Sequence, residues 1–135
     1  MKIDNKKAFF DYEILEKLEA GITLYGAEVK AIRLGHADLS GSFVRIIGSE
    51  AYLVNAKIFP YKYALPEGYD ERRTRKLLLH KNEIISLKSK IEGANLALVP
   101  LSIYTTKGFI KVQIGLGKGK KEYDKRAKIK KRDIQ

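Results

Sequence analysis

The chain has 135 residues, of which 44% are hydrophobic and 32% charged, and it includes 8 tyrosines and 5 phenylalanines. This length fits one domain rather than a two-domain enzyme, and the apolar content is high enough to exclude disorder throughout the chain. Its 27 lysines and arginines against 16 acidic residues give a net charge of +11, which favours a polyanionic partner, either nucleic acid or an acidic membrane surface.

The first predicted elements are a strand and a short helix. Apolar side chains alternate from Phe10 to Leu18, apart from an interruption at Glu16, which predicts a long half-buried strand over residues 10–18. Residues 27–34 predict a helix, because their apolar side chains recur at helical spacing and Gly35 follows the last of them.

A hairpin and a loop come next. Gly48-Ser49 joins two alternating segments, residues 42–47 and 50–58, and a glycine suits a two-residue turn that needs a positive φ at its first position. Residues 60–73 lack a periodic apolar pattern and predict an exposed loop.

A second helix and a second hairpin are predicted towards the C-terminus. Residues 83–92 carry apolar side chains at helical spacing, with Asn82 as the expected N-cap and Gly93 placed to end the helix. The hairpin turn is Lys107-Gly108, which joins residues 96–105 to residues 109–114.

Together these elements predict a mainly β fold of the α+β class, namely a small antiparallel barrel of the oligonucleotide-binding (OB) type with two or three flanking helices. Residues 1–115 would form the barrel, and residues 116–135, with nine cations and three anions, would form a flexible basic tail. Residues 115–121 are rich in glycine and lysine but lack the ending of a nucleotide-binding loop, so we interpret them as a flexible hinge whose lysines neutralise RNA phosphates.

Several features exclude other chemistry. The absence of cysteine excludes disulfides, cysteine-type zinc sites and thiol catalysis. Neither His36 nor His80 lies in a recognisable catalytic pattern, and no metal-ligand spacing is present. The N-terminus lacks an apolar signal core, and no apolar run approaches the roughly 18 residues of a membrane span. We therefore predict a cytoplasmic binding protein that is not an enzyme, needs no metal or cofactor and has no membrane contact.

A second group of cations consists of Arg72, Arg73, Arg75, Lys76 and Lys81. Arginine can bind phosphate bidentately and stack on bases, so we expect the three arginines to contact RNA; the alternative is that these charges only solvate a strand. Nearby aromatic side chains could stack on unpaired bases or could simply pack within the protein: Tyr61, Tyr63, Tyr69 and Tyr123.

Segments spread over nearly the whole chain resemble the bacterial tmRNA-binding protein family, also called SsrA-binding protein or SmpB. They are Asn5-Lys6-Lys7-Ala8, Asp11-Tyr12-Glu13-Ile14, Glu19-Ala20-Gly21-Ile22, Gly26-Ala27-Glu28-Val29-Lys30, Arg75-Lys76-Leu77-Leu78-Leu79-His80, Gly119-Lys120-Lys121 and Asp124-Lys125-Arg126. Each segment alone is modest, but all of them in this order are highly specific.

The resemblance implies a non-enzymatic adaptor of trans-translation with an OB-like barrel and flanking helices. Such a protein binds the tRNA-like domain of tmRNA and delivers it to stalled ribosomes, with elongation factor Tu engaged indirectly through tmRNA. The tail would enter the empty mRNA channel and reach the small-subunit decoding centre. We expect a monomer. The alternative function is that of a small structural ribosomal protein or a general RNA-binding protein.

The resemblance also implies particular residues. Those for tmRNA binding are Asn5, Lys6, Tyr12, Glu19, Lys76 and Leu78. We expect lysines to bind phosphates, Asn5 and Glu19 to hydrogen-bond base edges or 2′-hydroxyls, and Leu78 either to shape the surface or to lie in the core. Those of the tail that would act at the decoding centre are Gly119, Lys120, Lys121, Tyr123, Asp124, Lys125 and Arg126.

Overall fold

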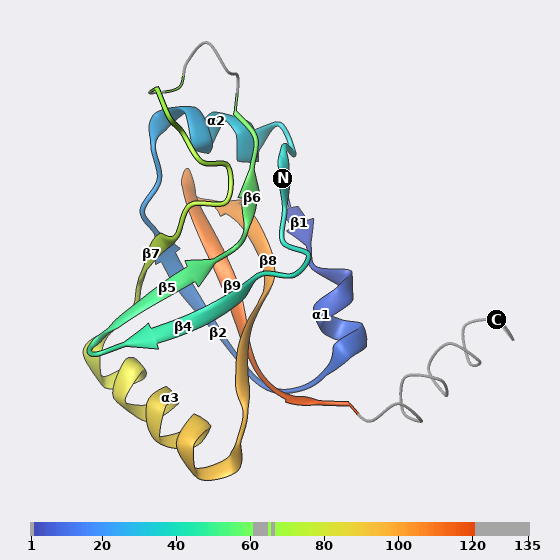
Figure 1. The fold of residues 1–135 in the computed structure, drawn as a ribbon, viewed down its shortest axis with the longest axis vertical. Helices are drawn as coiled ribbons and strands as arrows, with labels where there is room; N and C mark the ends of the chain where they lie inside the picture. The colour runs from blue at the N-terminus through green and yellow to red at the C-terminus, as the bar shows by residue number, and fades with distance from the viewer. Residues whose placement is uncertain (1, 61–64, 66, 121–135) are drawn as a thin grey trace, which may run out of the picture.

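A computed structural model describes residues 2–60, 65 and 67–120 of the chain (Figure 1). Its elements, in chain order, are β1 (Lys2–Asp4), α1 (Lys6–Asp11), β2 (Tyr12–Ile22), α2 (Gly26–Arg33), β3 (Ala37–Asp38), β4 (Phe43–Ile47), β5 (Glu50–Val54), β6 (Lys57–Ile58), β7 (Arg75–Leu78), α3 (Lys81–Ala94), β8 (Ala97–Thr106) and β9 (Phe109–Gly119).

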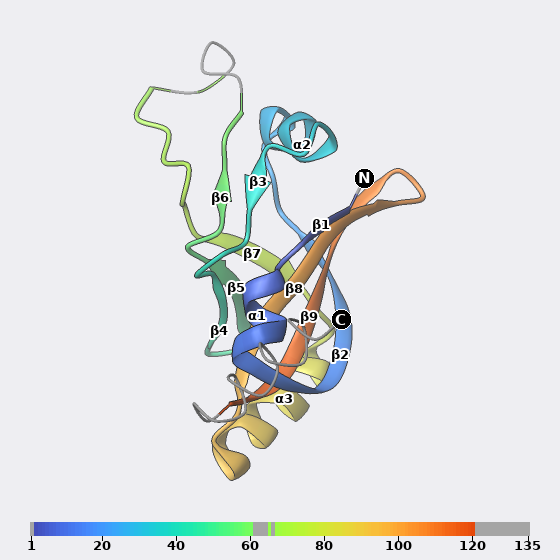
Figure 2. The same cartoon turned by 90° about the vertical axis from the view of Figure 1, so that its right-hand side faces the viewer.

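The strands form a closed antiparallel ring. The main sheet has the order β1-β8-β4-β5-β7-β2-β9, and the additional pairing of β8 with β9 closes it. Short β3 and β6 pair with each other as a separate ribbon. Figures 1 and 2 show α2 and this ribbon at one end of the barrel, α3 at the other end and α1 at the side. The OB-like barrel with flanking helices that the sequence predicts is therefore confirmed.

Alternating side chains of the strands fill the inside of the ring. The main core includes side chains that are at most 2% exposed: Ala51, Leu53, Leu77, Val112 and Ile114. A smaller cluster lies beneath α1, where Ala8 packs with Val99 and Leu101. The pairing of β2 with β9 shifts register between Ile14 and Glu16, which is why the alternating pattern of this strand is interrupted at Glu16.

The strand predicted from residue 10 was wrong at its start, because α1 extends to Asp11 and β2 begins only at Tyr12. The side chain of Asn5 accepts a hydrogen bond from the Ala8 backbone N–H and thereby caps the helix. With only 6 residues, α1 is too short to show a helical apolar period, so the N-cap was the one signal for it in the sequence.

Both predicted hairpins are confirmed. Gly48 has a φ of 62°, and Lys107 and Gly108 have φ values of 50° and 81°, as tight hairpin turns require. The strand predicted over residues 50–58 is divided, however, because Asn55 with a φ of 65° separates β5 from β6.

The helix predicted over residues 83–92 is longer than expected. It begins at Lys81, so Asn82 lies inside it and His80 is the N-cap, with the Glu83 carboxylate accepting from the His80 backbone N–H at 3.0 Å. Its end is set by Asn95, which adopts the left-handed conformation with a φ of 53°, and not by Gly93.

Residues 115–119 of the segment interpreted as a flexible hinge are in fact the last part of β9, which continues to Gly119 and pairs with β2. Two of its three glycines are required by close packing. A Cβ added at Gly115 would lie 2.9 Å from the Leu101 Cδ1, and one at Gly117 would lie 3.1 Å from the Tyr12 Cβ. The barrel therefore extends four residues beyond the expected boundary at residue 115. The rest of the predicted tail, residues 121–135, lies outside the described residues.

This close approach makes Gly115 sensitive to substitution. We expect Gly115→Val to lower the free energy of unfolding by about 1–3 kcal/mol, because the new side chain collides with fully buried Leu101. Gly119→Ala is the control, since a Cβ there meets no atom within 4 Å, and its effect should stay within about 0.5 kcal/mol. Urea unfolding followed by circular dichroism measures both, and equal stability of the two variants would contradict the packing argument.

Candidate nucleic-acid interface

The outer face of four neighbouring strands, β7, β2, β9 and β8, brings several of the predicted site residues together. The register places Leu78 opposite Gly21, Gly21 opposite Lys111, and Lys111 opposite Tyr104. Because Ala20 and Leu77 point into the barrel, Glu19, Lys76 and Leu78 point outward. We call the outward-facing set of Glu19, Lys76, Leu78, Tyr104 and Lys111 the outer face.

A hydrogen bond orients Glu19 on this face. The Tyr104 hydroxyl donates to the Glu19 Oε2 across β9, the strand that lies between β8 and β2. Burial, and then the hydrogen bond to Glu19, raise the pKa of Tyr104 to about 12, so the hydroxyl stays protonated and remains a donor at neutral pH. The Glu19 carboxylate is thereby held in place with acceptor capacity left for a donor from outside the protein.

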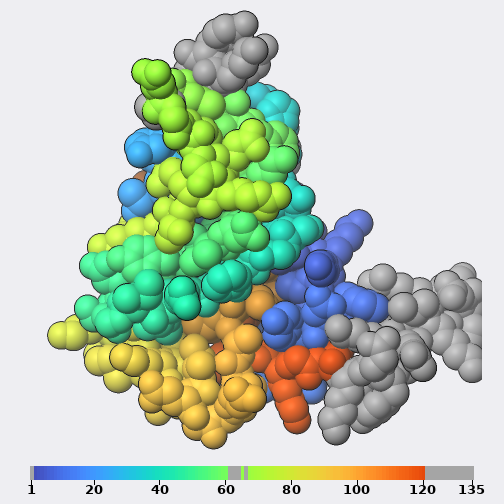
Figure 3. All heavy atoms as spheres, in the orientation of Figure 1, coloured from blue at the N-terminus to red at the C-terminus, as the bar shows by residue number. Residues whose placement is uncertain are grey.

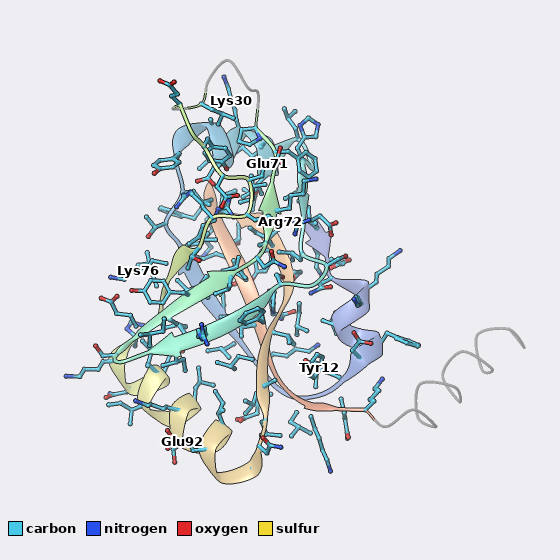
Figure 4. The ribbon with its side chains drawn as sticks, viewed as in Figure 1. Tyr12, Lys30, Glu71, Arg72, Lys76 and Glu92 are labelled. Atoms are coloured by element: carbon cyan, nitrogen blue, oxygen red, sulfur yellow. The ribbon has the colours of Figure 1, made fainter. Side chains whose placement is uncertain are left out.

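Lys76 is exposed and lies in a small polar network. Its Nζ is 3.2 Å from the Glu50 Oε1, and the Tyr52 hydroxyl donates to the other oxygen of Glu50. The hydrogen bonds from Tyr52 and Lys76 lower the pKa of Glu50. An exposed ion pair of this kind contributes little to stability, so a phosphate can replace Glu50 as the partner of Lys76 at little cost. Figure 4 shows Lys76 pointing away from the barrel.

Leu78 is a surface residue, since its side chain is 55% exposed. It lies over Gly21, where an added Cβ would be 3.2 Å from the Leu78 Cβ. Of the two roles considered from the sequence, the core role is therefore wrong. Gly21 is buried beneath Leu78, so the exposed side chain of Leu78 is the apolar part of the outer face beside Glu19.

Two of the three arginines expected to contact RNA are used inside the protein. Arg75 is 0% exposed, and its guanidinium donates to the Glu28 carboxylate, the Tyr69 hydroxyl and the backbone oxygens of Ala56, Glu71 and Arg73. Arg73 pairs with the same carboxylate, and its guanidinium carbon lies 4.2 Å from the centre of the Tyr25 ring. The expectation that Arg75 contacts RNA is wrong, because every donor of its fork already has a partner. Of the three, Arg72 is the exposed one (Figure 4).

Glu28 is the centre of this network and ties the segment before β7 to α2. Burial by itself would raise the pKa of Glu28, but hydrogen bonds from Arg73, the Tyr25 backbone, Tyr69 and Arg75 outweigh it and lower the pKa from 4.5 to about 2. The Tyr69 hydroxyl donates to Glu28 at 2.7 Å, so Tyr69 packs within the protein and is not free to stack on a base.

The remaining predicted residues lie at the other end of β2. Tyr12 pairs with Gly119, whereas Gly21 pairs with Leu78, so these two ends are about 30 Å apart at 3.3 Å per residue. Lys6 is exposed at the start of α1. Asn5 is 3% exposed; its side-chain oxygen accepts from the Ala8 N–H, and its side-chain nitrogen donates to the Pro100 oxygen. Asn5 therefore positions α1 and does not present its amide to RNA at the surface.

The start of the tail is attached to α1. The Lys120 backbone N–H donates to the Asp11 oxygen at 2.9 Å, and its Nζ donates to the Phe9 oxygen at 3.1 Å. Gly119 is the exposed last residue of β9. Other residues named from the sequence lie outside the described residues, namely Tyr61, Tyr63, Lys121, Tyr123, Asp124, Lys125 and Arg126.

The sequence analysis missed the contributions of Tyr52, Tyr104, Lys111 and Gln113 to this surface. Tyr52 on β5 and Gln113 on β9 each lie between two buried residues, and Lys111 precedes one of them, so local alternation was the signal that would have placed these three outward. On β8, residues 98–103 are all buried, so alternation gave no signal for Tyr104. Within the described part of the chain, no helix is long and apolar enough to cross a membrane, and no group of three or more potential metal ligands occurs.

Comparison with known proteins gives the family. The family described as SmpB protein matches residues 2–135. The chain belongs to the SmpB family. SmpB relatives named SsrA-binding protein occur in Sulfurihydrogenibium sp. (strain YO3AOP1), with 52% identity over 97% of this chain and 86% of the relative, and in Malacoplasma penetrans, with 52% identity over 96% of this chain and 88% of the relative. Another, from Chlorobaculum tepidum, is 49% identical over 98% of this chain and 85% of the relative.

A solved SmpB structure gives the same result for the fold. It is described as "tmRNA-SmpB: a journey to the center of the bacterial ribosome" and matches this chain with a TM-score of 0.73 and 48% sequence identity. The match covers 99% of this chain and 94% of that chain. This chain therefore has the fold of a solved SmpB protein, whose description names tmRNA and the bacterial ribosome.

Proposed function

We propose that this SmpB protein binds the tRNA-like domain of tmRNA and acts as the adaptor that brings tmRNA to stalled ribosomes. The observation that carries the proposal is the match to the SmpB family over residues 2–135, together with the solved tmRNA–SmpB structure that it resembles over 99% of the chain. This is a binding function and not an enzymatic one.

The outer face supports binding to folded RNA. Lys76 supplies a cation for a phosphate, and Glu19, held by Tyr104, supplies an acceptor for a base N–H or a 2′-hydroxyl. Leu78 adds an exposed apolar contact beside them. Structured RNA is recognised mainly by its shape and by phosphate and 2′-hydroxyl contacts, which these side chains on the outside of the sheet can make.

Finer parts of the proposal extend from this surface. Lys6 and Tyr12 would contact tmRNA at the other end of β2, and Asn5 would act by holding α1 in place. Arg72 would add a phosphate contact. The tail, from Gly119 to Arg126, would act at the decoding centre in the mRNA channel. Elongation factor Tu would be engaged only through tmRNA, and the protein would act as a cytoplasmic monomer.

Titration of the full chain with the tRNA-like domain and with an unrelated RNA hairpin of equal length tests the proposal over several salt concentrations. We expect Glu19→Gln to reduce the preference for the tRNA-like domain about tenfold, because a charged hydrogen-bond acceptor is lost. Lys76→Ala should weaken binding to both RNAs and reduce the salt slope by about 0.9, the contribution of one phosphate contact.

Lys30→Ala is the matched control for Lys76→Ala, because Lys30 is an exposed cation on α2 away from the outer face (Figure 4). It should change neither the preference nor the order of affinities. Equal affinity of the unaltered chain for the two RNAs at every salt concentration would contradict the adaptor function and would favour a structural ribosomal or general RNA-binding protein.

A further inference from the structure

A deep groove on the barrel lies apart from the outer face. It has a volume of about 580 Å³ and is bounded by α1, β4, α3 and the start of β8. Figure 3 shows the surface hollowed between α1 in blue, β4 in teal and the yellow and orange region of α3 and β8. The groove exists because β4 and β8 are paired at Val44 and Leu98 and then diverge, with one helix standing on each side of the gap.

Two aromatic side chains line this groove from different elements. Tyr12 follows α1 and is half-buried against the small cluster beneath that helix, whereas Phe43 begins β4 and is 42% exposed. Between them the floor is apolar, with Ile46, Ile91 and Leu98 among the lining residues. An exposed aromatic ring such as that of Phe43, beside an apolar floor, is a surface on which a nucleobase stacks.

Cations reach the same groove from three elements. They are Lys7 of α1, Arg45 of β4 and Lys88 of α3, all of them exposed. None of the ion pairs found among the described residues engages these three side chains. Asp11 and Glu92 also line the groove, so the charge balance there is positive by one. The three cations surround the apolar floor, at the positions where the phosphates of a nucleotide with a stacked base would lie.

We propose that this groove binds one unpaired nucleotide of an RNA, with its base between Tyr12 and Phe43 and its flanking phosphates at Lys7, Arg45 and Lys88. The volume lies within the range of small-ligand sites and admits a single nucleotide. The site differs from the outer face in what it recognises, because it takes a splayed base where the outer face takes the shape of a folded RNA. The groove shares Tyr12 with the proposed tmRNA contacts, and its test uses a single-stranded RNA unrelated to tmRNA.

A fluorescent variant measures this binding directly, because the chain contains no tryptophan. In Phe43→Trp, the single indole keeps a stacking surface in the groove, and titration with hexaadenylate RNA should quench its fluorescence in a saturable way. The control is Phe109→Trp, at an exposed position that does not line the groove, where no saturable quenching is expected. Thermal unfolding of both variants confirms that the substitutions leave the fold intact.

Charge variants in the Phe43→Trp background identify the phosphate contacts. Arg45→Ala and Lys88→Ala should each weaken hexaadenylate binding at least threefold and reduce the salt slope by about 0.7, the value for one phosphate of a single strand. Lys30→Ala, at an exposed cation that lines neither the groove nor the outer face, should leave both quantities unchanged. A base-paired RNA of the same length should quench far less than the single strand.

The proposal is overturned if the indole of the Phe43→Trp variant is not quenched, if the Phe109→Trp control is quenched equally, or if Arg45→Ala and Lys88→Ala have no effect beyond that of Lys30→Ala. These outcomes are separate from those of the tRNA-like-domain titration. Loss of groove binding with an intact preference for that domain would refute this site alone, whereas the reverse result would refute the proposed partner and keep the groove.

Discussion

Replacement of Glu28 by alanine is expected to lower the free energy of unfolding by about 3–5 kcal/mol, the cost of leaving a buried charge without its partner. The substitution leaves Arg75 without a charged partner, although its guanidinium is 0% exposed and lies 2.7 Å from the Glu28 carboxylate in the native protein. It also releases Arg73 and Tyr69, which hold the segment before β7 against α2. The remaining backbone acceptors of Arg75 are neutral, so they cannot offset its charge.

Urea unfolding followed by circular dichroism measures this loss, with Glu16→Ala as the matched control. Glu16 pairs with Lys90 at 2.8 Å, but both side chains are exposed, so its removal should cost less than about 1 kcal/mol. Because the pKa of Glu28 is lowered from 4.5 to about 2, its contribution is present above pH 4.5 and is lost as the pH falls towards 2. A Glu28→Ala chain as stable as Glu16→Ala would contradict the account of a buried network.

A chain that ends at Lys120 is expected to keep its preference for the tRNA-like domain and to lose the tagging of unfinished peptides. Residues 121–135 contain seven cations and three anions, whereas the whole core of the barrel lies before Lys120. Removal of these cations should lower the affinity for any RNA and flatten its salt dependence. The outer face, to which we assign the specificity, remains. The cut falls after Lys120, because a shorter chain would remove the strand residues that pair with Tyr12.

A reconstituted translation reaction on an mRNA without a stop codon measures tagging, and titration measures RNA binding. The control is a full-length chain in which residues 121–135 are scrambled, so that their charge is kept and their order is lost. We expect it to restore the salt slope but not the tagging. Tagging at the unaltered level by the chain ending at Lys120 would remove the tail from the mechanism, and loss of the preference would show that specificity lies in the tail.

The fold was predictable wherever local chemistry determines the backbone. The hairpins at Gly48 and Lys107 follow from turn residues whose positive φ the structure contains, and α2 follows from its apolar spacing. Some failures were local, since α1 with 6 residues is too short to show a helical period, but the error at the end of β9 comes from contact with residues distant in sequence. Gly115 and Gly117 suggest flexibility when considered alone, but they permit the close approach of Leu101 and Tyr12.

The same cause limited the prediction of the site. A cluster such as Arg72, Arg73 and Arg75 has the composition of an RNA-binding surface, and nothing in that cluster reveals that Glu28, 47 residues before Arg75, lies beneath it. The family resemblance placed Glu19, Lys76 and Leu78 in the site without showing that they share a face. Their grouping depends on strand register, which side-chain periodicity does not determine.

The two hydrogen bonds from Lys120 to α1 fix the point on the barrel from which residues 121–135 continue. Arg126 is six residues further along the chain than Lys120, and even a fully extended chain spans at most about 22 Å over that interval. Wherever Arg126 binds, the side of the barrel that carries α1 and Lys120 must therefore lie within that distance of it. The short connection from the end of β9 therefore limits the orientations that the barrel can take while Arg126 is bound.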